Sequence, residues 1–207
     1  MKGFTLKRAA ARHVVALVVL GFVPATFGCG SKQSESSSTG SAAPSTLGRT
    51  PKLFHIEASP EEVRGVQNDV KKRNDAFYSG DFKTLLEMTY DGLIERSGGA
   101  DKAVEAMRTS LEQSTARGMK IESFDFPEPP AFLKTTVREY VLVPTRKIMS
   151  VGAERAELVS FEFGVRSIGA PTWTYVDGPQ ITPANVNTLF PDFPVDCPLP
   201  AISRKKL

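Results

Sequence analysis

The sequence predicts an α+β domain in which a group of helices is followed by an antiparallel sheet. Between Ser59 and Gly118, apolar residues recur at spacings of three and four, which places them on one face of successive helices. Between Ile121 and Val176 they alternate with polar residues, which is the period of a strand with one buried face. Because the two kinds of segment are not interleaved, we expect helices packed on one sheet, in a domain at residues 59–200.

The first helix has a well-marked start and end. Ser59 takes the cap position, Pro60 stands in the first turn, and Glu62 follows three residues after the cap, which is the arrangement of a capping box. The residues of its apolar face are Val63, Val66, Val70 and Phe77. We expect the basic run 71–73 to lie on the solvated face of this helix, and the helix to end at Gly80.

Two more helices are expected before the sheet. Asp81 can cap a second helix, which ends before the turn at Asp91-Gly92. We expect Leu93-Ile94 to form a short extended piece. The glycines 98 and 99 then lead into a third helix, which ends near Gly118. The apolar residues of these two helices are Phe82, Leu85, Leu86 and Met88, then Ala103, Val104, Met107 and Leu111.

The sheet is predicted from period-two segments and from the prolines that bound them. The predicted strands are 121–126, 132–143, 147–151, 158–168 and 172–176. Pro144 is expected to break the chain between the second and third of these, because proline donates no hydrogen bond to a ladder. Six prolines lie between residues 179 and 200, around one short helix near 183–190. We expect this Pro-rich tail to lie along the surface and the basic residues 201–207 to fray.

The N-terminal residues predict a secretory signal and a lipid anchor. Residues 1–28 combine a basic stretch with a ten-residue apolar run, which is too short to span a bilayer. Gly28-Cys29 resembles the lipobox of bacterial lipoproteins, in which the cysteine is acylated. Residues 29–58 are rich in Ser, Gly and Ala, so we expect a disordered tether. The alternatives are an ordinary cleaved signal, with Cys29 incidental, and a membrane-spanning anchor.

Charge and histidine content exclude several classes of function. Without the four basic residues of the leader, 22 Lys and Arg stand against 23 Asp and Glu, which argues against nucleic-acid binding. The two histidines, His13 and His55, lie in the leader and near the end of the tether. With Cys197 as the one cysteine of the domain, a catalytic triad or a metal site is not expected, and we expect no cofactor. Cys197 has no basic neighbour in the sequence and is interpreted as an inert packing residue.

Several segments of the predicted domain resemble the nuclear-transport-factor-2-like (ketosteroid-isomerase-like) superfamily. They are the Gly-Asp turn within 74–88, the glycine-led helix start at 98–104, and the segments 173–178 and 189–194, which resemble uncharacterised envelope members of that superfamily. The resemblance covers about residues 60–200. It implies a strongly curved antiparallel sheet that wraps around helices as a cone, often with an apolar pocket at the mouth.

The resemblance assigns no catalytic residue. Isomerase-type members use a carboxylate base with a Tyr/acid pair, and no residues here match that set one by one. Our candidate ligand-binding residues are Tyr140, Phe161, Glu162, Arg166 and Trp173. We expect Tyr140 and Glu162 to share a sheet face with Arg138 and Arg166, as a polar cluster able to hold a ligand. The alternatives are a solvated face of Arg–Glu pairs and aromatic side chains that only fill the core.

Three hypotheses about function follow. The first is a non-enzymatic protein, anchored to the bacterial cell envelope through lipidated Cys29, that binds a small hydrophobic molecule or a protein. The second is a small isomerase or hydrolase that uses a buried carboxylate such as Glu162 or Asp125. The third is a structural module that forms a homodimer through its sheet. A deep pocket with a carboxylate beside a tyrosine hydroxyl would favour the second.

Overall fold

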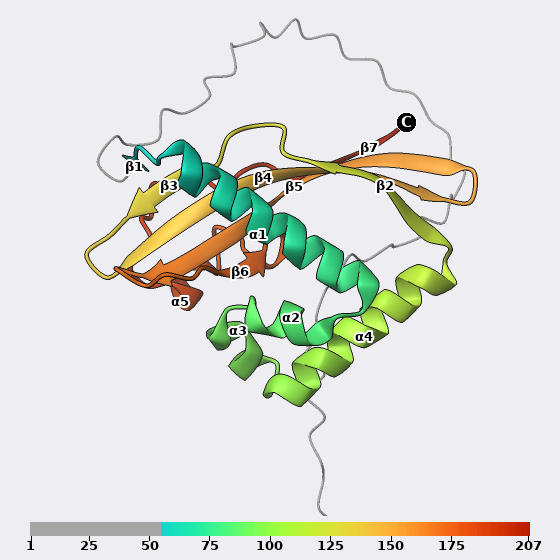
Figure 1. Cartoon of the computed structure of the whole chain (residues 1–207), viewed down its shortest axis with the longest axis horizontal. Coiled ribbons are helices and arrows are strands. Elements are labelled where there is room, and N and C mark those ends of the chain that lie inside the picture. Colours follow the sequence, from blue (N-terminus) through green and yellow to red (C-terminus); the bar gives the residue numbers. More distant parts are fainter. Residues whose placement is uncertain (1–54) are drawn as a thin grey trace, which may run out of the picture.

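The structure, a computed structural model, describes residues 55–207, so the predicted signal peptide, Cys29 and most of the predicted tether lie outside the described residues. The elements in chain order (Figure 1) are β1 (His55–Ile56), α1 (Pro60–Ser79), α2 (Phe82–Glu87), α3 (Asp91–Arg96), α4 (Ala100–Ala116), β2 (Met119–Asp125), β3 (Ala131–Lys134), β4 (Arg138–Val151), β5 (Glu154–Ser167), β6 (Thr174–Asp177), the short helix η1 (Gly178–Gln180), α5 (Val186–Leu189) and β7 (Ser203–Lys206). All named strands pair antiparallel, so the predicted α+β class with an antiparallel sheet is confirmed.

A long hairpin of β4 and β5 forms the centre of the sheet. Its register runs from Arg138 opposite Ser167 to Val151 opposite Glu154. β3 pairs with one end of β4 and β2 with the other, while β6 and β7 pair with opposite ends of β5. β1 adds to the outer edge of β3, which makes one sheet of seven strands among the described residues.

Helix α1 crosses one face of this sheet (Figure 1). The predicted capping box is present, with Ser59 Oγ accepting from the N–H of Glu62 and the Glu62 carboxylate accepting from the N–H of Ser59. The helix ends at Gly80, whose φ of 76° is the left-handed conformation that glycine adopts most easily. Val66 and Val70 are buried against the sheet. The other buried residues of this cluster are Phe132, Val141, Val143 and Tyr175.

The predicted second and third helices are confirmed as α2 and α4. Asp81 caps α2 by accepting a hydrogen bond from the N–H of Thr84, 3.1 Å away. α2 contacts both α1 and α4, and α3 also contacts α4. These helices extend the helical layer that α1 begins (Figure 1). The chain between α2 and α3 runs beside β6, where Thr89 bridges Tyr175, and Leu93 of α3 packs against the core cluster that contains Tyr140 and Phe163.

The Pro-rich segment covers the opposite face of the sheet at the end where β3 and β6 lie. Phe190 and Phe193 are at most 2% exposed, and their rings pack against those of Tyr140 and Phe163. We predicted that this segment lies along the surface, and the structure adds that its aromatic side chains complete the core. Cys197 is buried in the same cluster, and burial raises the pKa of its thiol to about 11, as an inert packing residue requires.

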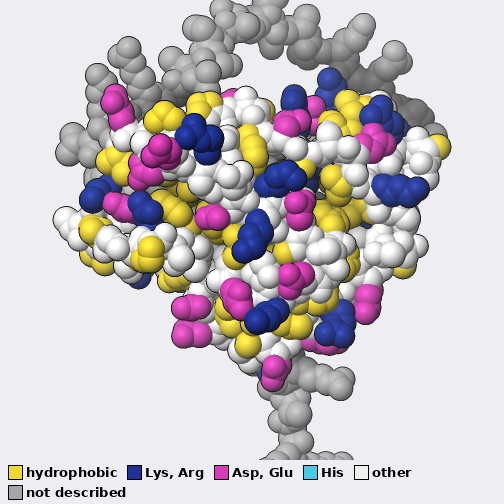
Figure 2. All heavy atoms as spheres, viewed as in Figure 1, with side chains coloured by type: hydrophobic (Ala, Val, Ile, Leu, Met, Phe, Trp, Pro, Cys, Tyr) yellow, Lys and Arg dark blue, Asp and Glu magenta, His cyan; other side chains and the backbone are white. Residues whose placement is uncertain are grey.

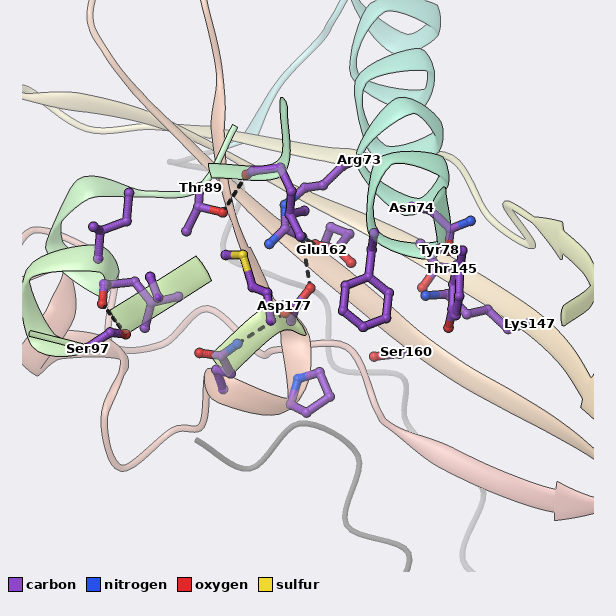
Figure 3. A pocket seen from close by; sticks show the side chains of 18 of the residues that line it. Arg73, Asn74, Tyr78, Thr89, Ser97, Thr145, Lys147, Ser160, Glu162 and Asp177 are labelled. Atoms are coloured by element: carbon purple, nitrogen blue, oxygen red, sulfur yellow. Dashed lines mark hydrogen bonds and ion pairs between the residues drawn. The ribbon is translucent and has the colours of Figure 1, made fainter. Parts of the chain in front are cut away.

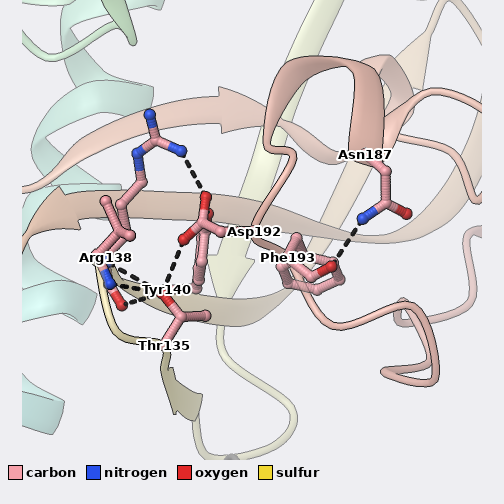
Figure 4. A network of polar contacts seen from close by, with 7 residues as sticks. Thr135, Arg138, Tyr140, Asn187, Asp192 and Phe193 are labelled. Carbon is pink, nitrogen blue, oxygen red and sulfur yellow. Dashed lines mark hydrogen bonds and ion pairs between the residues drawn. The ribbon is translucent and has the colours of Figure 1, made fainter.

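Asp192 fixes this segment to the sheet through polar contacts (Figure 4). Its carboxylate accepts hydrogen bonds from the Tyr140 hydroxyl at 2.7 Å and the Thr135 hydroxyl at 2.7 Å, and it pairs with the guanidinium of Arg138. Burial raises the pKa of Tyr140, and the hydrogen bond to Asp192 raises it further, so the phenol stays protonated as a donor. Polar contacts of Asp192 thus hold the Pro-rich segment to the sheet at the edge of the aromatic cluster.

Several predicted local structures are wrong. The predicted strand 132–143 is divided into β3 and β4, which pair with each other across a turn. Leu93-Ile94 belongs to helix α3, because Leu93 packs against the core cluster and a two-residue apolar run does not by itself distinguish helix from strand. Pro144 lies inside β4 and does not break it. On one edge of β4, residues 139–142 pair with β3 and residues 146–151 pair with β2. Pro144 lies between these two ranges, where no partner strand on that edge requires its missing N–H. The basic tail is not frayed, since Ser203–Lys206 pairs with β5.

Charged side chains of both signs are interspersed on the face that Figure 2 shows. This distribution agrees with the near-balance of acidic and basic residues outside the leader. Exposed charged side chains of the domain form ion pairs, such as Lys71–Asp75 on α1 and Lys83–Glu87 on α2. Pairs of this kind contribute little to stability, so the polar surface does not identify a site.

Candidate functional site

A cavity of about 120 Å³ lies between the helices and the sheet. Its wall is apolar and comes mostly from α1, α3, α4 and β5. The apolar side chains are Phe77, Leu85, Leu93, Ile94, Ala103, Met107, Leu158 and Pro179. Its polar part comes from the C-terminal half of α1, from β4 and β5, and from the end of β6 (Figure 3). The polar side chains include Arg73, Asn74, Tyr78, Lys147, Glu162 and Asp177.

Arg73 is the centre of the polar part. It follows Val66 and Val70 by seven and three residues, so the helical period turns it toward the sheet. Its Nη1 donates to Oε2 of Glu162 and to Oδ1 of Asp177, each at 2.8 Å. Only 5% of Arg73 is exposed, so the expectation that the run 71–73 is solvated is wrong for its last residue.

The two carboxylates beside Arg73 have pKa values shifted in opposite directions. Burial raises the pKa of Glu162 to about 8, and the attraction of Arg73 only partly offsets this. Burial also acts to raise the pKa of Asp177, but the charge of Arg73 and its hydrogen bond outweigh burial and hold the pKa below the usual value. The difference in exposure is consistent with this, since the side chain of Asp177 is 42% exposed and that of Glu162 only 13%.

Lys147 supplies the second positive charge of the cavity. Its ammonium lies 5.7 Å from the ring centroid of Tyr78 and 5.3 Å from that of Phe124. Within residues 55–207 it donates no hydrogen bond and forms no salt bridge. Burial lowers its pKa, although Glu162 and Asp177 oppose this. Burial also raises the pKa of the Tyr78 hydroxyl to about 12, so this phenol is neutral at physiological pH.

Two polar atoms on adjacent residues of α1 are buried without a partner. Nε of Arg73 and Oδ1 of Asn74 have no hydrogen bond among the described residues. An unpaired buried polar atom costs about 1–3 kcal/mol, and native proteins contain few of them. Stability alone does not explain these two unpaired atoms, and both residues line the cavity.

The predicted candidate residues do not form one cluster. Across the β4–β5 hairpin, Tyr140 pairs with Val165 and Glu162 pairs with Val143, which places the two polar side chains on opposite faces of the sheet. The expectation that they share a face is therefore wrong. Of the five candidates, only Glu162 lines the cavity.

The other four candidates have structural positions. Tyr140 and Phe161 are at most 1% exposed in the core that the Pro-rich segment closes. The guanidinium of Arg166 lies 4.3 Å from the ring centroid of Trp173 and donates to Glu139 at 2.6 Å. The alternative that the aromatic residues fill the core is confirmed for the first two.

The remaining site residues were missed for identifiable reasons. Arg73 carried a signal, because it continues the apolar face of the first helix, but its neighbours Lys71 and Lys72 suggested a solvated run. Asp177 comes directly after the predicted strand 172–176, and its position in the sequence does not mark it as a site residue. Lys147 stands in a stretch of β4 where basic and polar residues occur on both faces, so alternation does not mark it. Asp125, the other predicted carboxylate, pairs with Arg146 and does not line the cavity.

Comparisons with known proteins find no family model, no curated protein and no solved structure that matches this chain. No helix within residues 55–207 is both long enough and apolar enough to cross a membrane. In the same residues, no group of three or more His, Cys, Asp or Glu side chains is placed to hold a metal ion.

Proposed function

We propose that this chain is a lipid-anchored protein of the bacterial cell envelope whose domain binds a small molecule in the cavity between helices and sheet. The observation that carries the proposal is the composition of the cavity, with an apolar wall on one side and a few convergent polar groups, Arg73, Lys147 and Glu162, on the other. Small-molecule sites commonly combine these two features. The signal-like leader, Cys29 and the Ser-rich segment 29–58 support the anchored location.

The proposal includes membership in the nuclear-transport-factor-2-like superfamily, with the sheet curved into a cone around the helices. The order of helices before an antiparallel sheet, and the cavity between the two, support it. The Gly-Asp turn at residues 80–81 ends α1 and begins α2, as the resemblance implies.

An isomerase or hydrolase is the second candidate, and a specific observation favours it. Glu162, Asp177 and Tyr78 line the same cavity. The pKa of Glu162 is raised and that of Asp177 is lowered, and Tyr78 supplies a hydroxyl group. Two carboxyl groups with pKa values pushed apart are typical of acid–base catalysis. An enzyme would turn over a ligand that binds there, so product analysis after incubation distinguishes the two candidates.

Dimerisation through the sheet has less support. The Pro-rich segment covers the outer face at one end. Toward the other end, ion pairs link Arg146 with Asp125 and Arg155 with Glu122. An obligate dimer interface is more apolar than such a surface.

A thermal-shift screen of metabolite pools tests the binding proposal. We expect at least one pool to raise the melting temperature of the chain, and Met107→Trp, which fills the cavity from α4, to abolish the shift. Met119→Trp on β2 is the matched control, because Met119 is also half-buried but does not line the cavity. Equal shifts in both variants would contradict a ligand site in this cavity.

A further inference from the structure

The cavity has an uneven distribution of charge partners. Arg73 is held by both carboxylates, Glu162 and Asp177, at 2.8 Å each. The ammonium of Lys147, the other cation, has no carboxylate within salt-bridge distance among the described residues and lies over the rings of Tyr78 and Phe124. Aromatic faces attract an ammonium group but do not neutralise its charge. The charged group of the cavity that lacks an ion-pair partner among the described residues is therefore a cation, the ammonium of Lys147.

The protonation of the neighbouring groups increases this positive bias. The charged or titratable groups that interact with Glu162 are Arg73 of α1, Lys147 of β4, and Tyr175 and Asp177 of β6, and Tyr78 of α1 lines the same cavity. Helices α2, α3 and α4 line the cavity with no acidic or basic side chain. Because burial favours the neutral form of Glu162, the set carries a net positive charge when that carboxyl is protonated. A negative charge entering the cavity would stabilise the protonated forms of both Glu162 and Lys147.

We propose that the ligand of this cavity is a small organic monoanion, an aryl or short alkyl carboxylate, whose charged group pairs with the ammonium of Lys147. This inference rests on the proposed binding function and adds the chemical class of the ligand. The apolar part of the ligand lies against α3 and α4, where Ile94 and Met107 line the wall. The volume of about 120 Å³ suits one ring or a short chain, since an apolar cavity of roughly 150 Å³ accommodates benzene.

Other ligand charges fit the site less well. A cation would meet Lys147 without a free carboxylate to bind, because Arg73 already occupies both. A neutral ligand without an acceptor would leave the part-buried ammonium of Lys147 with no direct hydrogen-bond or ion-pair partner among the described residues, and burial of an unpaired charge is costly. A carboxylate supplies the missing acceptor, and charge-assisted hydrogen bonds are stronger than neutral ones.

Benzoate and its neutral analogue benzyl alcohol test the inference. Their dissociation constants for the full chain are measured at pH 6 by ligand-observed NMR. We expect benzoate to bind the wild type at least tenfold more tightly than benzyl alcohol. In Lys147→Met, which keeps a side chain of similar length without the charge, this preference should fall below threefold while benzyl alcohol still binds. Lys83→Met is the control, since that side chain is 87% exposed on α2, and it should keep the wild-type preference.

The outcomes separate the inference from the function on which it rests. Equal affinities of the wild type for both probes would overturn the anionic class and leave the binding proposal standing. An undiminished preference in folded Lys147→Met would overturn the pairing of the ligand with Lys147 and likewise leave the binding proposal standing. No binding of either probe to the wild type would overturn the proposed cavity function together with the inference. The wild-type preference requires no variant, so it decides the matter even where Lys147→Met does not fold.

Discussion

Nη1 of Arg73 on α1 lies 2.8 Å from Oε2 of Glu162 on β5, a residue 89 positions later in the chain. The side chains of both are largely buried, at 6% and 13% exposure. Asp177 binds the same nitrogen from the end of β6. One guanidinium thus connects the first helix to two strands at the polar end of the cavity.

Removal of Arg73 should destabilise the fold. Arg73→Met leaves Glu162 without its partner, and breaking a buried pair costs about 3–5 kcal/mol. We expect a loss of roughly 2–4 kcal/mol in the free energy of unfolding, less than the full cost, because Glu162, with a pKa of about 8, is already mostly protonated at pH 7. Urea denaturation at pH 7 measures this. Arg64→Met, at an exposed position of the same helix, should cost less than about 0.5 kcal/mol, and equal losses in the two variants would contradict the role of Arg73.

Glu162 should make stability fall as the pH rises. Its pKa in the folded protein, about 8, lies above the ordinary value of 4.5, so the native state holds a proton that the unfolded state has released. This contribution is complete below about pH 4.5 and is lost as the pH passes through 8. We expect the free energy of unfolding of the wild type to fall, relative to that of Glu162→Gln, by on the order of 2–4 kcal/mol between pH 5 and 8.

Urea titrations at each pH check this difference. Glu87→Gln is the control, because the Glu87 side chain is 63% exposed, and it should retain the wild-type pH dependence. If Glu162→Gln loses stability with pH as steeply as the wild type, then the buried carboxyl is not the group that titrates.

Asp192 should hold the Pro-rich segment against the sheet. Asp192→Ala removes the acceptor of Tyr140, Thr135 and Arg138 together, and we expect a loss of about 2–3 kcal/mol in the free energy of unfolding. The loss should be local, so hydrogen exchange should accelerate at residues 186–197 more than in α1. Uniform acceleration of hydrogen exchange across the domain would contradict a role of Asp192 that is confined to the Pro-rich segment.

The fold was predictable wherever local signals and packing agree. The capping box at Ser59 and the turn at Gly80 fix the ends of α1 through contacts within a few residues, and both were predicted. Pro144 and Leu93 were not, because their conformations depend on which strands and side chains meet them from elsewhere in the chain.

The site was less predictable than the fold. Glu162 was found because alternation along its strand sets it apart from the apolar residues of β5. The partners that give it chemical meaning, Arg73 and Asp177, come from elements distant in sequence. Tyr140 was grouped with Glu162 wrongly, since the register of the β4–β5 hairpin, which sets the face of each residue, cannot be read from either strand alone.

The proposed lipid anchor leads to a prediction about Cys29. A chain with a folded domain and a Ser-rich N-terminal segment stays at a membrane stably if it carries two or more acyl chains, which lipoprotein modification supplies. We expect the protein to fractionate with membranes in a bacterial host and Cys29→Ser to be released or misprocessed. Mass spectrometry of the mature N-terminus checks the modification, and an unacylated terminus, or one that begins at another residue, would refute it.

The central claim is that the cavity beside Arg73 and Lys147 is a ligand site, and methyl NMR with benzoate tests it most directly. We predict saturable shifts of the methyl signals of Ile94 and Met107, which line the cavity, with a single dissociation constant. Met119 and Ile202, which do not line it, should not respond. Saturable shifts confined to Met119 or Ile202, or no shifts at millimolar benzoate, would contradict the account.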